Sequence, residues 1–287
     1  MDQHEVLDGD LRGVLMLPDD HKSAPAVVVL GGSSGGVPAT LAAAAAERGL
    51  VALGVGYFGA EGLQPNLVQV PVEIVEAALR WLSRGPRSGN GPVALLGVSK
   101  GAELALLAAS LMPSLVGSVV AVAPSSVVFA GIVSGRASSE SSWTWRRHDV
   151  PFVPYDPSVG PQFTQHGMRT RPMYEAALAN RTSAETGVIE VERITAPVLL
   201  LSGSDDQVWP SSSMGLAIRA RAVAYGVGDN VEHVVYEGAG HLLLTARPAV
   251  GNSGFSFDFG GTAEGAAAAS ADVWSRLTEF IKGANAQ

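Results

Sequence analysis

The chain has 287 residues, of which 47% are hydrophobic and 34 are glycine, a composition typical of an α/β protein with many tight turns. The formal net charge of -8 argues against a nucleic-acid partner, and the lack of cysteine excludes disulfides, cysteine metal ligands and a cysteine nucleophile. The acidic start and the absence of an apolar run approaching about 18 residues predict neither a signal peptide nor a membrane span. We therefore expect a cytoplasmic protein that has no membrane partner.

Apolar, strand-like runs alternate with helical patterns along the chain. Strands are expected at residues 11–17, 26–30, 51–55, 93–97, 117–123, 197–202 and 231–236, and helices at 38–48, 71–84, 100–112, 211–225 and 270–283. This alternation predicts an α/β fold with a mostly parallel central sheet and helices on both faces. We expect a single domain over residues 1–287, because the candidate site residues are spread between positions 99 and 241.

One stretch, residues 131–193, interrupts the alternation ahead of the strand expected at 197–202. It is rich in Ser, Pro and Arg, with Trp143, Trp145, Phe152 and Tyr155 among them. A long irregular insertion is typical of a lid or substrate-binding loop, in which Trp143 and Trp145 would contact the substrate. A loop packed by its own aromatic side chains is an equal alternative. The small residues of 261–271 are expected to form a loop that leads into the last helix.

The pattern G-x-S-x-G, in which a serine sits on a sharp turn from strand to helix, occurs three times. Ser99 follows the apolar run 93–96 closely, and a helical pattern begins directly after it. Ser33 and Ser34, in the glycine-rich segment 31–36, are separated from the next helix by further loop. Ser99 is therefore the candidate nucleophile, and the alternative is a serine that only caps the helix.

Attack of a serine on a carbonyl creates an oxyanion, which two backbone N–H donors typically stabilise. The first expected donor is the N–H of Lys100, the residue after the candidate nucleophile, and the second is the N–H of Ser33 in the glycine-rich loop. A phosphate-binding role for this loop is the weaker interpretation. It has neither the Lys-Ser/Thr ending of a P-loop nor the G-x-G-x-x-G spacing.

A candidate acid and base follow in the order Ser, acid, His, which is the order of an α/β-hydrolase triad. Asp205 and Asp206 come after the apolar run 198–203, where parallel sheets place site residues. Asp206 is favoured because its spacing after Gly203 resembles the acid of that fold, and Asp205 is the alternative. His241 is the candidate base, since among the six histidines it alone follows a strand directly through a glycine turn.

Three segments, 93–104, 196–211 and 236–241, resemble the C-terminal catalytic domain of acyl-CoA thioesterases and bile acid-CoA:amino acid N-acyltransferases, a dienelactone hydrolase-like α/β-hydrolase. Two shorter matches lie at Gly56-Tyr57-Phe58 and at 191–194. The resemblance implies a serine hydrolase that cleaves acyl-CoA or related thioesters through a Ser-His-Asp triad and an acyl-enzyme, without metal or cofactor. The serine at position 99 favours the thioesterase branch, since the amidating branch carries cysteine there.

Other activities stay open. Larger members of the family carry a β-sandwich domain ahead of this one, whereas about 25 residues precede the first central strand here, so a carboxylesterase or lactone hydrolase is an alternative. Transfer of the acyl group to an amine or alcohol is another, and a non-catalytic ligand-binding relative is a third. Arg146 and Arg147, with Arg169 and Arg171, are candidates to meet the phosphates of CoA or to form a solvated face. No feature of the sequence indicates an oligomeric state.

Overall fold

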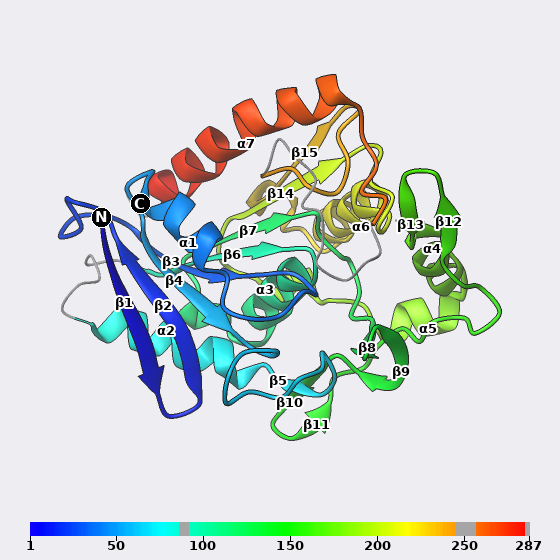
Figure 1. The fold of residues 1–287 in the computed structure, drawn as a ribbon, viewed down its shortest axis with the longest axis horizontal. Coiled ribbons are helices and arrows are strands. Elements are labelled where there is room, and N and C mark those ends of the chain that lie inside the picture. Colours follow the sequence, from blue (N-terminus) through cyan, green and yellow to red (C-terminus); the bar gives the residue numbers. More distant parts are fainter. Residues whose placement is uncertain (86–91, 245–256, 285–287) are drawn as a thin grey trace.

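An eight-stranded sheet forms the centre of the molecule, with helices on both faces (Figure 1). The computed structural model describes residues 1–85, 92–244 and 257–284. The strand order is β1-β2-β4-β3-β6-β7-β14-β15. In chain order these strands are β1 (Asp2–Asp8), β2 (Leu11–Leu17), β3 (Ala26–Leu30), β4 (Val51–Gly56), β6 (Ala94–Val98), β7 (Ser118–Val122), β14 (Val198–Gly203) and β15 (Val231–Tyr236).

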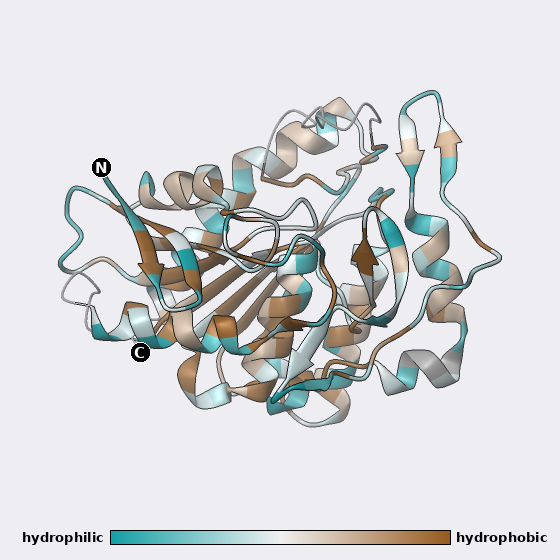
Figure 2. Ribbon diagram, turned by 60° about the horizontal axis from the view of Figure 1, so that its bottom comes forward, coloured by the Kyte–Doolittle hydropathy of each residue, from teal (hydrophilic) through white to brown (hydrophobic). Residues whose placement is uncertain are grey.

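The six strands from β4 to β15 in this order are parallel, and β1 and β2 add an antiparallel pair at one edge. The sheet is mostly parallel, as expected, and the expected strands agree with the observed ones to within a residue at each end. The central strands are apolar at nearly every position because both faces are covered. Figure 2 shows them as a brown layer inside the molecule.

Two apolar cores lie against the two faces of the sheet. One contains buried residues of α2 (Glu73–Arg84), α3 (Lys100–Leu111) and α6 (Ser211–Ala224), and the other contains those of α1 (Ala39–Ala46) and α7 (Ala263–Ala284). Alternate residues of one strand enter opposite cores, so that Val28 packs in the first and Val27 and Val29 in the second. Three short 3-10 helices, η1 (Pro113–Leu115), η2 (Val191–Arg193) and η3 (Gly228–Asn230), lie in connecting segments.

Two terminal elements differ from expectation. Strand β1 is additional, and its sequence gave no strand signal because only Val6 of its seven residues is buried. Helix α7 begins at Ala263, so the interpretation of 261–271 as a loop is wrong over most of that range. Alanine, which is abundant in this stretch, has the highest intrinsic helix propensity of the amino acids. Within the described ranges, no helix combines the length and apolar character needed to cross a membrane.

The insertion at 131–193 is more regular than expected. It contains the hairpins β8 (Ala130–Val133) with β9 (Arg136–Ser141), β10 (Trp143–Trp145) with β11 (His148–Asp149), and β12 (Gln162–Thr164) with β13 (Gly167–Arg169). Helices α4 (Arg171–Ala179) and α5 (Arg181–Thr186) follow. The strands are too short and too polar to show a period, and β10 is paired by the distant β5 (Val70–Pro71). The hairpin β12–β13 and helix α4 lie toward the carboxyl ends of the parallel strands (Figure 1), whereas η2, at the end of the insertion, leads into the amino end of β14.

Candidate active site

Ser99 occupies a strained turn between β6 and α3. Its backbone has φ 57° and ψ -121°, a region that a residue with a side chain rarely adopts. Its N–H donates to the carbonyl of Val122 on the neighbouring strand, and its own carbonyl accepts from Ala102. Although Ser99 directly precedes α3, its side chain makes no capping hydrogen bond. The serine hydroxyl therefore lies at the carboxyl end of β6 and does not cap α3.

The two glycines of the motif are required by close backbone contacts. A Cβ at Gly97 would lie 2.1 Å from the carbonyl oxygen of Gly101, and a Cβ at Gly101 would lie 2.3 Å from the carbonyl oxygens of Leu30 and Gly31. Any side chain at these positions would displace backbone. The turn therefore packs α3 directly against the end of β3, from which the glycine-rich loop 31–36 begins.

Asp206 and His241 form a buried pair, and Leu242, which follows His241, lines one cavity with Val98, which precedes Ser99. His241 Nδ1 lies 2.8 Å from Asp206 Oδ2, and neither residue has more than 4% of its surface exposed. Asp206 also accepts hydrogen bonds from the N–H groups of Val208 and Trp209 and from the Ser211 hydroxyl. These donors fix the carboxylate, which in turn fixes the imidazole with Nδ1 toward the acid.

Asp205, the alternative acid, faces a different neighbourhood. One carboxylate oxygen accepts from the Gln207 side chain at 2.5 Å, and the other accepts from the N–H of Gly261 at 2.9 Å. The structure thus brings Asp206, and not Asp205, to His241. His233, another histidine near the sheet, is bonded to Ser202, and burial lowers its pKa.

The glycine-rich loop approaches the candidate nucleophile. A Cβ at Gly32 would lie 3.4 Å from Ser99 Cβ and 3.8 Å from its Oγ. The exposed residue Ser33 follows, and neither its N–H nor that of Lys100 donates to any residue within the described ranges. A cavity of about 320 Å³ opens on this side, between the loop and Leu242 to Leu244. Two free N–H groups beside a serine and an apolar cavity suit the binding of a carbonyl oxygen and its acyl chain.

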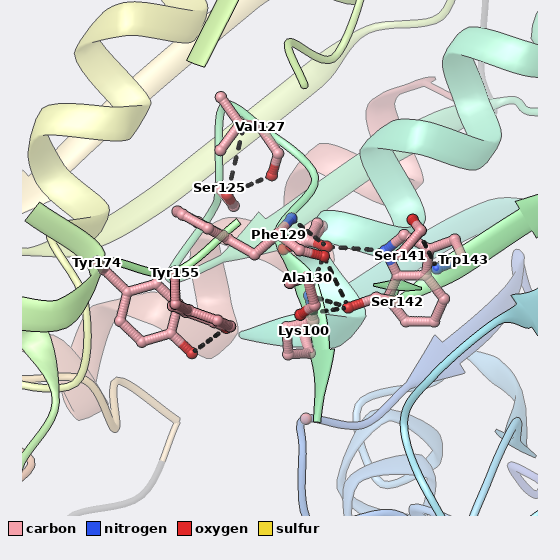
Figure 3. A network of polar contacts seen from close by, with 12 residues as sticks. Lys100, Ser125, Val127, Phe129, Ala130, Ser141, Ser142, Trp143, Tyr155 and Tyr174 are labelled. Atoms are coloured by element: carbon pink, nitrogen blue, oxygen red, sulfur yellow. Dashed lines mark hydrogen bonds and ion pairs between the residues drawn. The ribbon is translucent and has the colours of Figure 1, made fainter. Parts of the chain in front are cut away.

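The side chain of Lys100 lies away from solvent in a polar network (Figure 3). Its Nζ contacts Glu103 Oε1 at 2.5 Å and Ser142 Oγ at 2.8 Å, and Lys100 and Glu103 are 1% and 0% exposed. Burial alone lowers the pKa of Lys100 and raises that of Glu103, and each charge opposes the shift of the other. This ion pair was not predicted from the sequence, although Lys100 and Glu103 have the i, i+3 spacing that brings side chains together on a helix.

Trp143 does not occupy the position expected for a substrate contact. Its side chain is 0% exposed, and its Nε1 donates to Glu103 Oε1 at 2.7 Å. The expectation of direct substrate binding is wrong for this residue, because the indole fills the core and is bonded there. Trp145 is half-buried under the Arg146 guanidinium, whose carbon lies 5.4 Å from the ring centre.

The four arginines of the insertion that were candidates for phosphate contact are of two kinds. Arg146 and Arg147 are exposed and form the two-residue turn of the β10–β11 hairpin, both with positive φ. Arg169 pairs with Asp258, and Arg171 pairs with Glu175 and donates to the carbonyl of Asp206. Arg169 and Arg171 therefore hold the end of the insertion near the acid loop.

An aromatic cluster surrounds the candidate base. The Trp209 ring lies 5.9 Å from the His241 ring, Tyr174 lies 5.4 Å from Trp209, and Tyr155 lies 5.3 Å from Tyr174. On another side, Phe259 stacks at 6.4 Å, and its carbonyl accepts from the N–H of His241. Phe259 was not singled out from the sequence, since it lies in a glycine-rich stretch without periodicity.

No group of three or more metal-ligating side chains comes together among the residues that the structure describes.

Solved structures share the fold at low sequence identity. A putative dienelactone hydrolase from Klebsiella pneumoniae superimposes with a TM-score of 0.60 at 15% identity, covering 98% of each chain. Est1E from Butyrivibrio proteoclasticus gives a TM-score of 0.55 at 14% identity, covering 99% of this chain and 98% of the other. These similarities establish an α/β-hydrolase fold.

Sequence relatives are more specific. Acyl-coenzyme A thioesterase 1 of Mus musculus is 26% identical in an alignment of length 282 that covers 96% of this chain and 64% of the relative. Acyl-coenzyme A amino acid N-acyltransferase 2 of Mus musculus is 23% identical in an alignment of length 290 that covers 98% of this chain and 65% of the relative. The chain thus spans less than two thirds of the length of these relatives. The family model described as "BAAT / Acyl-CoA thioester hydrolase C terminal" matches residues 70–287, and the chain belongs to this family.

Proposed function

We propose that the chain is a serine hydrolase that cleaves acyl-CoA or a related thioester, with Ser99 as nucleophile, His241 as base and Asp206 as acid. The observation that carries the proposal is the buried 2.8 Å contact between His241 Nδ1 and Asp206 Oδ2, together with the strained turn at Ser99 and the cavity that Val98 and Leu242 both line. With Nδ1 held by the acid, Nε2 is the ring atom left to take the serine proton. The family to which the chain belongs supports an acyl thioester as the substrate.

The reaction proceeds in two balanced halves. His241 takes the Ser99 proton while Oγ bonds to the thioester carbon, and the resulting oxyanion accepts from the N–H groups of Lys100 and Ser33. Collapse breaks the C–S bond, and the thiolate receives the proton from His241. A water molecule then loses a proton to His241 and attacks the acyl-enzyme, and the proton returns to Ser99 as the acid is released.

Of the residues that the structure describes in the insertion, none lines the cavity beside the glycine-rich loop, and the insertion is proposed instead to add an aromatic wall on the side of His241. Tyr155 and Tyr174 are its contribution to the aromatic cluster around His241, and their hydroxyls lie 3.3 Å apart (Figure 3). Burial raises the pKa of both hydroxyls, so both stay neutral beside the site. An aromatic wall with two neutral hydroxyls favours an apolar acyl group.

Hydrolysis of oxygen esters is a second candidate. It is favoured because two of the arginines considered for phosphate contact are already paired with carboxylates. Arg169 and Arg171 are engaged with carboxylates, whereas Arg146 and Arg147, like Arg136, are exposed and make no ion pair with the side chains described here. A short uncharged ester needs no such cation. A panel of acyl-CoAs set against p-nitrophenyl esters of equal chain length separates the two candidates by kcat/KM.

The central test is mass spectrometry of the intact protein after incubation with the acyl-CoA panel. The wild type should gain one acyl mass that maps to Ser99, and Ser99→Ala should gain none and lose about 10⁶ in kcat. Ser33→Ala is the matched control, since it removes a hydroxyl from the neighbouring motif and keeps the backbone N–H. If Ser33→Ala is inactive and Ser99→Ala is active, the nucleophile has been assigned to the wrong motif.

A further inference from the structure

The loop proposed to supply the second oxyanion donor accepts hydrogen bonds from one tyrosine side chain, in addition to a backbone bond from the Gly36 N–H to the Phe58 carbonyl at 2.9 Å. Tyr57 directly follows β4, the strand next to β3, and its ring is 3% exposed. Its hydroxyl lies 2.6 Å from the carbonyl oxygen of Gly31 and 3.2 Å from that of Gly32. Glycines at 31, 32, 35 and 36 leave the loop with wide conformational freedom, so its geometry depends on such contacts.

The planarity of the peptide bond links these carbonyls to the N–H groups. In a trans peptide the C=O of one residue and the N–H of the next point in opposite directions. Holding the Gly31 and Gly32 carbonyls at Tyr57 therefore turns the N–H groups of Gly32 and Ser33 away from Tyr57. The Gly32 carbonyl accepts from Tyr57, and a Cβ at Gly32 would lie 3.4 Å from Ser99 Cβ, so this part of the loop lies between the two side chains.

We propose that Tyr57 is a positioning residue, whose hydroxyl sets the direction of the Ser33 N–H toward the oxyanion formed at Ser99. This inference rests on the proposed function. Tyr57 acts through the backbone and touches neither substrate nor nucleophile. Removal of its hydroxyl leaves the Gly31 carbonyl without its donor and the Gly32 carbonyl with the 3.4 Å contact from the Gly35 N–H, so the first part of the loop is held less firmly.

The buried network beneath the site fixes Tyr57 in turn. The Tyr57 ring packs at 5.6 Å against Trp143, Trp143 donates to Glu103, and Glu103 binds Lys100. Lys100 carries the other oxyanion donor on its backbone. A continuous set of contacts thus runs from one donor to the other. Burial and the Glu103 charge raise the pKa of Tyr57, so its hydroxyl remains a donor.

The test is Tyr57→Phe, which removes one oxygen atom and keeps the ring. Loss of an oxyanion donor costs about 10² to 10³ in kcat, and a donor that is present but misdirected should cost about 10- to 100-fold. We expect kcat to fall by this factor while KM stays within about twofold. Tyr236→Phe is the matched control, because it removes a buried tyrosine hydroxyl bonded to Asp272 outside the site, and its kcat should equal that of the wild type.

Ligand affinity distinguishes positioning from a general structural role. A trifluoromethyl ketone with an acyl tail forms a tetrahedral oxyanion on Ser99, whereas the thioether analogue of the thioester does not. Tyr57→Phe should weaken the ketone by the same factor as kcat and leave the thioether unchanged. Equal weakening of both ligands, or a kcat within threefold of the wild type, overturns the proposal. If the wild type itself neither turns over thioesters or esters nor forms the ketone adduct, the proposed function fails instead.

Discussion

Separating the charges of the Lys100–Glu103 pair should destabilise the fold strongly, whereas removing both should not. Glu103→Gln leaves the Lys100 cation in a site with 1% exposure and no carboxylate, and Lys100→Met leaves the Glu103 anion buried. Loss of one partner from a buried pair costs about 3–5 kcal/mol. For a chain of this size, that lowers Tm by about 6–15 °C.

The double variant Lys100→Met/Glu103→Gln restores electrical neutrality without loss of volume. Methionine replaces the lysine stem, and the glutamine carbonyl can still accept from Trp143 Nε1 and the Phe129 N–H, which now bond to Glu103 Oε1. Glu103 Oε2 has no hydrogen-bond partner among the described residues, so a glutamine nitrogen there gains none and costs about 1–2 kcal/mol. We therefore expect the double variant to be more stable than either single variant.

Urea unfolding of the wild type, both single variants and the double variant gives the coupling energy of the pair. We expect about 3 kcal/mol or more in favour of the charged partners being present or absent together. The reasoning is refuted if the two single losses simply add in the double variant. That result means that each side chain is stabilised by its other contacts and that the pair is not a coupled unit.

Two further predictions concern the acid and the charged leaving group. Asp206→Asn should lower kcat by about 10³ to 10⁴, because the imidazole loses the tautomer that the acid sets, whereas Asp205→Asn should stay within a few-fold since its contacts are to Gln207 and Gly261. Steady-state kinetics ranks them, and the opposite order transfers the acid role to Asp205. Replacing both Arg146 and Arg147 by alanine should raise KM for CoA thioesters and not for p-nitrophenyl esters; an equal effect on both substrates counts against phosphate contact.

The central strands could be predicted from the sequence because burial on both faces makes them nearly continuous apolar runs. Residues 26–30 and 198–203 show this, and their ends also locate the candidate site. Strand β1 could not be predicted, since pairing with β2 and not its own pattern makes it a strand. The hairpins of the insertion could not be predicted either, because their strands of two to six residues are also defined by pairing and not by their own pattern.

Within the site, order and local context identified the residues that the structure brings together, His241 with Asp206 in particular. The roles of buried side chains were harder to predict. Trp143 lies in a serine- and arginine-rich stretch that resembles surface, yet distant contacts with Glu103 and Tyr57 bury it. Lys100 likewise resembles a solvated helix residue in the sequence, because the contacts that bury it come from distant segments. The burial of the Lys100–Glu103 pair beside the Ser99 turn depends on packing between segments that are far apart in the sequence. A local sequence pattern cannot predict such packing.

The Lys100–Glu103 pair lies directly after the strained backbone of Ser99 and helps to hold it. A non-glycine residue at positive φ costs about 1–3 kcal/mol and persists only where its surroundings determine it. Here the surroundings are of two kinds: backbone contacts at Gly97 and Gly101 that permit the turn, and the Lys100 side chain that anchors the next residue to Glu103 and Ser142. Ser142 belongs to the insertion, so the first part of the insertion is hydrogen-bonded to the turn that bears the candidate nucleophile. Its hairpins therefore contribute to the stability of the turn as well as to the surroundings of the site.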